Sequence, residues 1–471
     1  MAIEPIIEEL RPAPSGPELF ARLQGEPGCF FLDSAMEGGP FGQYSFLGAR
    51  PFLIIRSKGE AIDIIQGDQV QRRTGNPFDI IEDLLNQYQI QSPSDKNIPP
   101  FLGGAVGYFG YDLCHHIEEL PRQSVDDLNL PDCTLGFYDT VLIVDHATRK
   151  SYIAATGLPE LDPDRAHTCA EERIKEMRDA LSQPVGSPSH RSSRGAHTSP
   201  IVSNFSKAHY VDAVIKAKEY IAAGDIYQVN LSQRLSTKLT LSPQDLYLHL
   251  RRMNPAPFAA FLHFEPVTVV SSSPERFLRI SDRHVQTRPI KGTRRRGRDP
   301  LEDARLAQEL WNSEKDRAEL VMIVDLERND LGRVCEYGSV HVPELITMET
   351  YPTVFHLVST VEGTLRPDVT HIGCLRACFP GGSITGAPKI RAMEIIDELE
   401  PTQRGIYTGA IGYMGFNRET DLNIVIRTMV LVRDRIYFQV GGGIVADSDP
   451  EAEYIETLDK ARALIKAARA G

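Results

Sequence analysis

Strand-like segments follow one another directly in this chain instead of alternating with helices. Near the C-terminus the runs YTGAIGYMGF, DLNIVIRTMVLV and RIYFQVGGGIV are rich in β-branched and aromatic residues and are separated by short turns. In the N-terminal part, YSFLGARPFLIIRSKGEAIDII and TVLIVDHATRKSYIAAT have the same character. Neighbouring strands of this kind are typical of antiparallel sheets with helices packed outside them. We therefore expect an α/β (α+β) fold in which antiparallel sheets form a central sandwich flanked by helices.

Five segments have the apolar spacing and the end signals of helices. They are residues 164–182, 206–223, 314–330, 387–400 and 450–470. The second is expected to end at Gly224, a typical helix terminator. In the last, Ser448 or Asp449 can cap the first turn, and Pro450 fits there because its missing N–H costs nothing.

The chain is too long for one hydrophobic core. Single cores stop growing beyond roughly 250 to 300 residues, and this chain has 471. The clearest boundary is SQPVGSPSHRSSRGAHTSPIVSN, residues 182–204, which is rich in Ser, Pro, Gly and His and has no apolar period. We predict an N-terminal domain over residues 1–181, a flexible linker over 182–204 and a second domain over 205–471.

The sequence carries no sign of export or of a membrane span. The N-terminus is acidic, and no apolar segment reaches the ~18 residues of a membrane helix. Seven cysteines, with no CxxC pair, are an odd number for a disulfide framework. We therefore expect a cytoplasmic protein with reduced thiols and no membrane partner.

Basic residues gather in RPIKGTRRRG, although the chain has a formal net charge of -13. The overall charge disfavours nucleic acid, whose binding requires a broad positive field. The cluster is then either ordinary surface charge or the wall of a site for a small anion. Lys291 stands between Ile290 and Gly292, and partial desolvation among arginines disfavours the charged form of a lysine. Such an amine can act as a nucleophile.

Acidic residues on two predicted helices are candidate metal ligands. Glu453, Glu456 and Lys460 are spaced to share one face of the last helix, and Glu319 lies on an otherwise apolar face of the 314–330 helix. Mg²⁺ prefers oxygen ligands and usually takes one or two protein carboxylates beside waters and substrate. The simpler interpretation is a surface pair between Glu456 and Lys460, which stabilises a helix by about 0.2 to 0.5 kcal/mol.

Two glycine-rich stretches, residues 379–389 and 440–450, run into predicted helix starts. The first, FPGGSITGAPK, has Ala387 and Pro388 where a P-loop needs Lys and Ser or Thr, so it does not match a nucleotide triphosphate site. Free backbone N–H groups at helix starts favour anions such as carboxylates. A pair of tight turns without a ligand explains the same glycines equally well.

Together these segments resemble the chorismate-utilising enzymes, the family of the large subunits in aminodeoxychorismate and anthranilate synthesis. The matching segments, in the family's order, are GDIYQVNLSQR, SSSPERF, RPIKGTRRRG, EKDRAELVMIVDLERNDLGRV, GGSITGAPKIRAMEIIDELEP, GAIGY, IVIRT and GGGIVADSDPEAEYIETLDKARA. FLDSAMEGGPFGQYSFLGARP and FLGGAVGYFGYD look like the family's N-terminal domain. The resemblance implies the anthranilate synthase component I-like fold, with a chorismate-binding catalytic domain over 205–471.

Lys291 separates two branches of this family. The anthranilate enzymes carry alanine, in PIAGT, whereas the aminodeoxychorismate enzymes carry PIKGT, as this chain does. NPAPFAAF, where the anthranilate enzymes usually show NPSPY, favours the same branch. The resemblance therefore implies conversion of chorismate and ammonia to 4-amino-4-deoxychorismate, on the route to para-aminobenzoate and folate. In that reaction Lys291 attacks chorismate C2, and Glu275 protonates the leaving C4 hydroxyl.

The resemblance assigns further residues by matching positions. The Mg²⁺ ligands that it implies are Glu319, Glu453 and Glu456. The substrate-binding residues that it implies are Arg427, Lys460, Gly441, Gly442, Gly443, His356, Thr385, Tyr407 and Gln228. At position 228 the water-adding relatives have a lysine base, so glutamine argues against water as the nucleophile. Ser34 matches the serine with which anthranilate enzymes bind tryptophan, and it marks a candidate tryptophan site.

Two positions depart from the family pattern. Leu320 replaces the polar residue that usually follows Glu319, and Arg295 replaces a proline, which predicts a more cationic and more mobile loop around Lys291. No segment is recognisable as a glutamine amidotransferase, so the resemblance implies a separate glutaminase subunit as partner. Two alternatives stay open: an anthranilate synthase large subunit, and a non-catalytic regulatory protein that binds tryptophan or nucleic acid.

Overall fold

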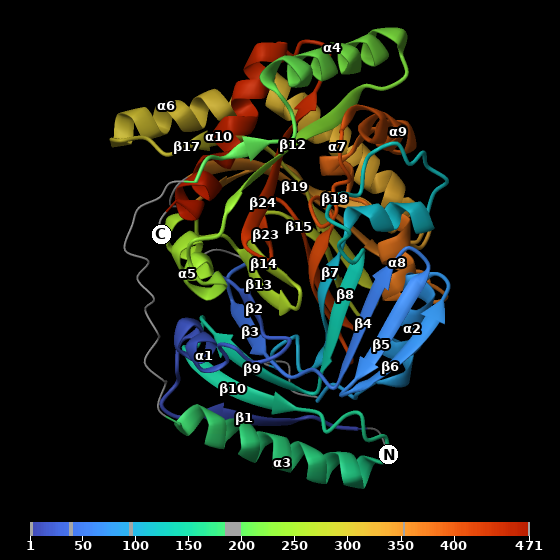
Figure 1. Cartoon of the computed structure of the whole chain (residues 1–471), viewed down its shortest axis with the longest axis vertical. Coiled ribbons are helices and arrows are strands. Elements are labelled where there is room, and N and C mark those ends of the chain that lie inside the picture. Colours follow the sequence, from blue (N-terminus) through green and yellow to red (C-terminus); the bar gives the residue numbers. More distant parts are fainter. Residues whose placement is uncertain (1–2, 37–40, 94–97, 184–198, 352–353, 470–471) are drawn as a thin grey trace.

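The structure, a computed structural model, describes residues 3–36, 41–93, 98–183, 199–351 and 354–469. In this part of the chain two twelve-stranded sheets pack together, with helices on their outer sides (Figure 1). The side chains of Phe46 in one sheet and Tyr413 in the other meet with ring centroids 5.4 Å apart. Neighbouring strands pair antiparallel in both sheets. The predicted antiparallel sandwich flanked by helices is confirmed.

The first sheet has the order β1-β10-β9-β3-β2-β13-β14-β23-β24-β12-β11, with β20 paired to β12. In that order its strands are β1 (Ile6–Leu10), β10 (Lys150–Ala155), β9 (Thr140–Asp145), β3 (Tyr44–Gly48), β2 (Phe30–Asp33), β13 (Phe258–Phe264), β14 (Val267–Ser273), β23 (Thr428–Val432), β24 (Arg435–Ile444), β12 (Gln228–Lys238), β11 (Val202–Ser203) and β20 (Gly386–Ala387).

The second sheet has the order β17-β19-β16-β15-β22-β21-β7-β8-β4-β5-β6, with β18 paired to β19. In that order its strands are β17 (Ile290–Arg295), β19 (Val354–Thr364), β16 (His284–Arg288), β15 (Arg276–Ser281), β22 (Glu419–Ile424), β21 (Ala410–Gly415), β7 (Gly104–Phe109), β8 (Cys133–Tyr138), β4 (Leu53–Lys58), β5 (Ala61–Gln66), β6 (Gln69–Thr74) and β18 (His341–Thr350).

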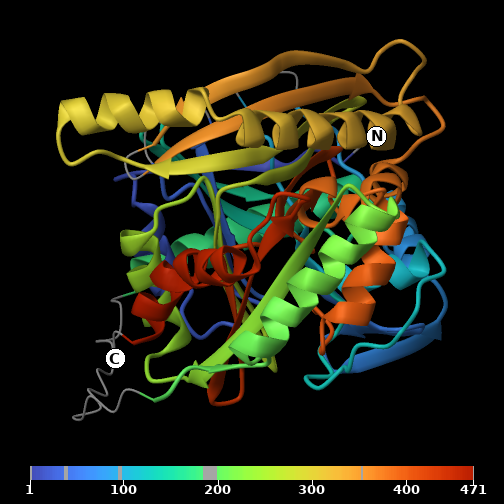
Figure 2. The same ribbon diagram turned by 90° about the horizontal axis from the view of Figure 1, so that it is seen from above.

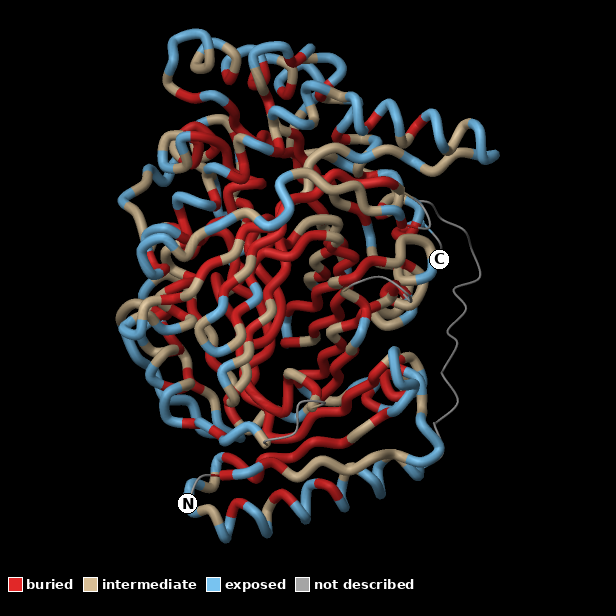
Figure 3. Tube along the Cα trace, turned by 180° about the vertical axis from the view of Figure 1, so that it is seen from behind, coloured by how far each residue is buried: buried red, intermediate tan, exposed pale blue. Residues whose placement is uncertain are grey.

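Helices cover the sheets, and buried residues concentrate along the strands (Figure 3). The α-helices are α1 (Gly16–Arg22), α2 (Pro77–Gln87), α3 (Pro163–Ser182), α4 (Lys207–Ala223), α5 (Pro243–Met253), α6 (Pro300–Trp311), α7 (Glu314–Gly332), α8 (His371–Cys378), α9 (Lys389–Leu399) and α10 (Pro450–Ala468), and the 3₁₀ turns are η1 (Tyr111–His116) and η2 (Gly382–Ile384). In Figure 2 the yellow and gold helices α6 and α7 lie along strands β17 to β19. No helix of the described residues is both long and apolar enough to cross a membrane.

The five predicted helices are confirmed as α3, α4, α7, α9 and α10. Helix α4 ends at Gly224, whose φ of 84° is left-handed, as the sequence predicted. In α10 the Asp449 side chain accepts a hydrogen bond from the backbone N–H of Ala452, and Pro450 occupies the first turn. These helix ends are local effects of single residues, which explains why the sequence located them correctly.

Both sheets draw strands from both sides of the predicted linker. Strands from 1–181 and from 205–471 pair directly, for example β2 with β13 and β7 with β21. One hydrophobic core accordingly includes residues from the two parts, such as Phe46 and Leu262. Residues 184–198 of the predicted linker lie outside the described residues, and Val202–Ser203 at its end form β11. Neither sheet separates at that boundary. The division into two domains therefore stays a prediction.

The run DLNIVIRTMVLV is two strands rather than one. β22 belongs to the second sheet and β23 to the first, so the chain crosses between the sheets at residues 425–427. Arg427, at the end of this crossing, has a left-handed φ of 52°. A non-glycine residue adopts that conformation at a cost of roughly 1 to 2 kcal/mol. The crossing brings Arg427 to the place where the two sheets meet.

A buried ion pair ties three elements together beside this crossing. The guanidinium of Arg404 contacts the Glu400 carboxylate at 2.7 Å, and the two side chains are 1% and 3% exposed. Arg404 also donates to the backbone carbonyls of Ile384 in η2 and Asn230 in β12, at 3.0 and 2.7 Å. Glu400 accepts from the backbone N–H of Ser232 at 2.8 Å. The pair therefore connects the end of α9 to η2 and to β12.

We predict that Arg404→Met lowers the free energy of unfolding by about 3 to 5 kcal/mol, because it leaves the Glu400 carboxylate buried without its partner. Urea unfolding measures the change. Arg391→Met is the matched control: Arg391 pairs with Asp225 at 2.8 Å but is 38% exposed, so it should change stability by less than about 1 kcal/mol. Equal unfolding midpoints for Arg404→Met and the wild type would contradict this role.

Candidate functional site

A cavity of about 520 Å³ opens among β17, α7, β24, α10 and η2. Its volume is in the range of pockets that bind small organic ligands. Most of the predicted site residues line it, although they come from distant parts of the sequence. They are Glu275, Lys291, Glu319, His356, Tyr407, Arg427, Gly441, Gly443, Glu456 and Lys460. All of them belong to the predicted second domain, 205–471.

Lys291 and Glu275 lie together on the cavity wall. The Lys291 Nζ donates a hydrogen bond to the backbone carbonyl of Ser383 at 3.1 Å. Burial lowers the pKa of Lys291, although the charges of Glu319 and Glu275 oppose the shift. Burial raises the pKa of Glu275, against a hydrogen bond from Ser383 and the charge of Lys291. Both shifts favour the neutral forms, an amine that can attack and a carboxyl that can give a proton.

Three acids of α7 and α10 lie at this cavity: Glu319 and Glu456 line it, and Glu453 stands behind its wall. A Cβ at Gly442 would lie 3.1 Å from Glu453 Oε2 and 3.6 Å from Glu456 Oε1, so the two carboxylates share one side of that glycine. Burial and the charge of Glu456 raise the pKa of Glu453, while burial, the largest contribution, raises the pKa of Glu319. For Glu456, burial is outweighed by the charge and hydrogen bond of Lys460, and its pKa is lowered.

These acids fit a magnesium ion by the chemistry of their donors. All are hard oxygen ligands, and like charges at Glu453 and Glu456 repel until a cation lies between them. Lys460 holds Glu456 at 2.7 Å, and Lys315 stands 3.9 Å from Glu319. Among the described residues no three acids, histidines or cysteines are grouped closely enough to enclose an ion. Waters and substrate oxygens would therefore have to complete the ligand set.

The cations of the cavity are held by backbone oxygens. The Arg427 guanidinium donates to the carbonyl of Lys460, and the Lys460 Nζ donates to the carbonyl of Gly441 at 2.9 Å. A carbonyl accepts a hydrogen bond without neutralising the charge, so Arg427 stays attractive to an anion, whereas Lys460 also pairs with Glu456. His356 is a neutral neighbour, because burial and then the charge of Arg427 lower its pKa to about 4. Its Nδ1 lies 2.9 Å from Thr293 Oγ1.

Four predicted residues stand behind the cavity wall rather than on it: Gln228, Thr385, Gly442 and Glu453. The Thr385 hydroxyl donates to the carbonyls of Gly381 and Gly382, so it holds the turn η2 in shape. A Cβ at Gly443 would lie 2.0 Å from Gln228 Nε2, which means that Gln228 fills the space this glycine leaves. The contact of Thr385 with a ligand stays a prediction, and in this structure its hydroxyl supports the turn.

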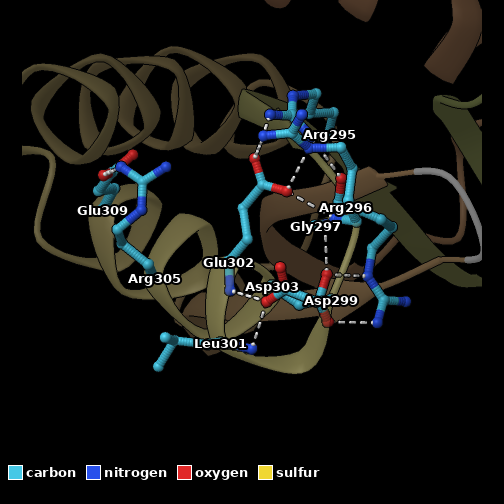
Figure 4. Close-up of polar contacts among 10 residues, drawn as sticks. Arg295, Arg296, Gly297, Asp299, Leu301, Glu302, Asp303, Arg305 and Glu309 are labelled. Atoms are coloured by element: carbon cyan, nitrogen blue, oxygen red, sulfur yellow. Dashed lines mark hydrogen bonds and ion pairs between the residues drawn. The ribbon is translucent and has the colours of Figure 1, made fainter.

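The arginines of RPIKGTRRRG do not form an open basic wall. Arg295 and Arg298 pair with Glu302 at 2.5 and 3.0 Å, and Arg296 pairs with Asp303 at 2.5 Å (Figure 4). Hydrogen bonds from Arg298 and Arg295 lower the pKa of Glu302 to about 2. The expected cationic loop is therefore corrected, since the first turn of α6 supplies its counter-charges. This pairing also weakens the nucleic-acid alternative.

The remaining basic residues around Lys291 are paired as well. Arg294 lines the cavity and contacts Asp316 at 3.0 Å. Arg288 contacts Glu349 at 2.7 Å. Within this segment Lys291 differs, because its hydrogen-bond partner is a carbonyl rather than a carboxylate. Lys291 is thus the basic residue of this segment that an incoming ligand meets without a carboxylate partner.

The sequence-based prediction missed several residues of the cavity. They are Asn230, Thr293, Arg294, Ser313, Lys315, Asp316, Ser383 and Gln439. Ser383 is the most informative of them, because its backbone carbonyl accepts the hydrogen bond from Lys291 Nζ. The motif GGSITGAPK drew attention to this turn, but only through its glycines and its missing P-loop lysine. Nothing local in the sequence indicates that its serine meets β17.

A second cavity of about 340 Å³ lies between the sheets and contains Ser34 on its wall. The Ser34 hydroxyl donates to the carbonyl of Tyr44 at 2.7 Å. Aromatic residues Phe41 and Phe258 line the same cavity, and the Phe41 ring stacks over the Arg288 guanidinium at 4.4 Å. The candidate tryptophan residue is therefore in a pocket separate from the one that holds Lys291.

Comparisons with known proteins agree with this geometry. The family model described as chorismate binding enzyme matches residues 36–466. An anthranilate synthase component 1 of Acetivibrio thermocellus is 42% identical over 95% of this chain and 92% of its own length. The aminodeoxychorismate synthase component 1 of Escherichia coli (strain K12) is 40% identical over 95% of this chain and 94% of its own length.

A solved structure also matches this fold. The crystal structure of anthranilate synthase component I from Streptococcus pneumoniae TIGR4 has a TM-score of 0.79 and 33% sequence identity. The match covers 91% of this chain and 93% of that one. The expected anthranilate synthase component I-like fold is confirmed, whereas relatives of the two activities are almost equally similar in sequence.

We predict that Mg²⁺ raises the melting temperature of the protein and that Glu456→Gln removes most of this rise, because the variant loses a carboxylate ligand. Binding at ~100 times the dissociation constant stabilises a fold by about 2.7 kcal/mol. Differential scanning fluorimetry measures the shift. The control is Glu451→Gln, on the same helix but paired with Lys207 at the surface. The same rise in Glu456→Gln as in the wild type would remove Glu456 from the metal site.

Proposed function

The chain belongs to the chorismate-binding enzyme family, and from this premise we propose that it converts chorismate and ammonia to 4-amino-4-deoxychorismate through a covalent bond to Lys291. Family membership makes it a chorismate-utilising enzyme of the aminating class. The observation that carries the narrower proposal is the position of Lys291. Its Nζ faces the cavity beside Glu275, with a carbonyl as hydrogen-bond partner and a lowered pKa.

Substrate binding uses Arg427, which contacts a backbone carbonyl, and Lys460, which also pairs with Glu456. Chorismate carries two carboxylates, and Arg427 and Lys460 stand near each other on the cavity wall. Burial makes their attraction for an anion stronger than it would be in water. Glu319, Glu453 and Glu456 would hold Mg²⁺, and the bound ion would neutralise a substrate carboxylate. Neutral His356 adds a hydrogen-bonding group without further charge.

In the first step the neutral Lys291 amine forms a bond to chorismate C2. The two conjugated ring double bonds shift, and the C4–O bond breaks. Glu275 gives its proton to the departing hydroxyl, which leaves as water. The raised pKa of Glu275, caused mainly by burial, favours the protonated carboxyl that this step requires. The step ends with a Lys291 adduct and a Glu275 carboxylate.

In the second step ammonia forms a bond to C4. The two double bonds shift back, and the bond between C2 and the Lys291 nitrogen breaks, which restores the neutral amine. The new ammonium group gives a proton to the Glu275 carboxylate, so the acid is ready for another turnover. The ammonia would come from glutamine through a separate glutaminase subunit. The relatives' names as component 1 support this arrangement.

A second candidate is the reaction named in the anthranilate synthase relatives, one of which is 42% identical. That reaction adds ammonia at C2 directly and needs no amine from the protein. Lys291 would then have no role in the chemistry, although it lies where a nucleophile would attack. The two candidates differ in product, because 2-aminobenzoate is fluorescent while aminodeoxychorismate needs a separate lyase to become 4-aminobenzoate.

The cavity at Ser34 supports a proposal of its own, that tryptophan binds there. Its aromatic lining suits an indole ring, and its volume of about 340 Å³ accommodates an amino acid. The Ser34 hydroxyl now donates to Tyr44, so it would offer a lone pair to a ligand ammonium group rather than its proton.

We predict that Lys291→Met abolishes formation of aminodeoxychorismate from chorismate and an ammonium salt, while the affinity for chorismate changes by less than about tenfold, because binding rests on other cations. The product is detected as 4-aminobenzoate after addition of the lyase, by mass spectrometry. Lys466→Met, at an exposed lysine of α10, is the control and should keep wild-type turnover.

Without ammonia, the wild type should accumulate a mass gain equal to chorismate less one water, and Lys291→Met should not. Wild-type turnover in Lys291→Met would contradict the covalent role. Formation of 2-aminobenzoate by the wild type without the lyase would instead establish the second candidate.

A further inference from the structure

One side-chain amide of the cavity wall has an acceptor without a partner. Asn230 belongs to β12, lines the cavity and is 8% exposed. Its side-chain oxygen, Oδ1, is fully buried and has no hydrogen-bond partner among the described residues. Most buried acceptors in folded proteins are hydrogen-bonded, and an unpaired one lowers stability. A polar atom of this kind in the wall of a ligand-sized cavity indicates a contact with the ligand.

The backbone of Asn230 is bonded to the turn that contacts Lys291. The Asn230 N–H donates to the carbonyl of Thr385 at 2.7 Å, and the Asn230 carbonyl accepts from the Arg404 guanidinium at 2.7 Å. Two residues before Thr385, the carbonyl of Ser383 accepts from Lys291 Nζ at 3.1 Å. Asn230 is therefore held in place on the side of the cavity where the proposed nucleophile lies.

The direction of the Asn230 side chain follows from a glycine of β24. A Cβ at Gly441 would lie 2.8 Å from Asn230 Oδ1, so the amide oxygen uses the space that this glycine leaves. Lys460 donates to the carbonyl of the same glycine at 2.9 Å and pairs with Glu456 at 2.7 Å, rather than with the amide oxygen. A hydrogen-bond donor for Oδ1 has therefore to come from the cavity.

The chemistry of chorismate decides which group can be this donor. Its carboxylates are ionised at neutral pH and its enol ether has no O–H, so these groups only accept hydrogen bonds. The hydroxyl on C4 is the one donor of the molecule. We propose that the Asn230 amide oxygen accepts a hydrogen bond from the C4 hydroxyl and thereby orients the substrate. The inference rests on chorismate as the substrate of the proposed function and adds a binding residue to it.

This contact is compatible with the departure of the hydroxyl. A hydroxyl donates one hydrogen bond and has two lone pairs, so its oxygen can donate to Asn230 and still receive the proton of Glu275. Asn230 and Glu275 both line the cavity. A hydrogen bond to the amide fixes the rotation of the hydroxyl about its C–O bond, which leaves the lone pairs for the acid.

The test measures how much the C4 hydroxyl contributes to binding. Chorismate is compared with an analogue that has hydrogen in place of this hydroxyl, by isothermal titration calorimetry with Mg²⁺. All proteins carry Lys291→Met, so that binding is not followed by reaction. With Asn230 present, chorismate should bind about 10- to 100-fold more tightly than the analogue. Asn230→Leu should lower this ratio by about tenfold, whereas Asn230→Asp, which keeps an oxygen acceptor, should retain it.

The ratio of the two affinities separates a contact from a structural role. A shift of the strand, or the charge that Asn230→Asp introduces, changes both affinities by the same factor and leaves their ratio unchanged. Asn230→Ala removes the same oxygen without adding volume, and it replaces Asn230→Leu if that variant does not fold. The same ratio with and without the oxygen would overturn the inference.

The inference and the proposed function fail in different ways. If the wild type makes 2-aminobenzoate, the proposed function fails, but the affinity ratios still decide the role of Asn230, since both candidate reactions start from chorismate. If the wild type makes aminodeoxychorismate and the ratio does not depend on Asn230, only the inference fails.

Discussion

The buried pair between Arg404 and Glu400 is the interaction on which the geometry of the cavity depends. A buried guanidinium is tolerated only when its donors find acceptors. Those of Arg404 reach the Glu400 carboxylate, the carbonyls of Ile384 and Asn230 and the Thr408 hydroxyl. Satisfying one charge thereby binds the end of α9, the turn η2 and strand β12 to each other. The side of the cavity formed by η2 and β12 is therefore held in place by this ion pair.

The distribution of counter-charges decides which cations can meet a ligand. The arginines that follow Lys291 are paired with carboxylates of α6 and α7, which neutralises them locally. Lys291 and Arg427 instead donate to backbone carbonyls, which orient a charged or polar group without cancelling it. An acidic protein can in this way present a cationic site to a small dianion while its most basic segment serves the structure.

The parts of the fold that sequence predicted well depend on nearby residues. Helices α4 and α10 end and begin where Gly224 and Asp449 indicated, because capping acts over one turn. The run DLNIVIRTMVLV was harder to divide into strands from sequence. Both of its halves have strand composition, and only long-range pairing assigns them to different sheets. The same applies to the boundary at 182–204: composition indicated a break, but strands from both sides pair within each sheet.

By itself the sequence determined the antiparallel class of the fold, the approximate limits of five helices and, through its resemblance to a family, the candidate site residues such as Lys291, Glu275 and Glu319. Only the tertiary structure decided that the neighbouring arginines pair with Glu302 and Asp303, that Thr385 supports a turn, and that the Ser383 carbonyl accepts a hydrogen bond from Lys291. The reason is physical. A side chain's type is local, but its charge state and its partner depend on burial and on groups from distant strands, which come together only when the sheets pack.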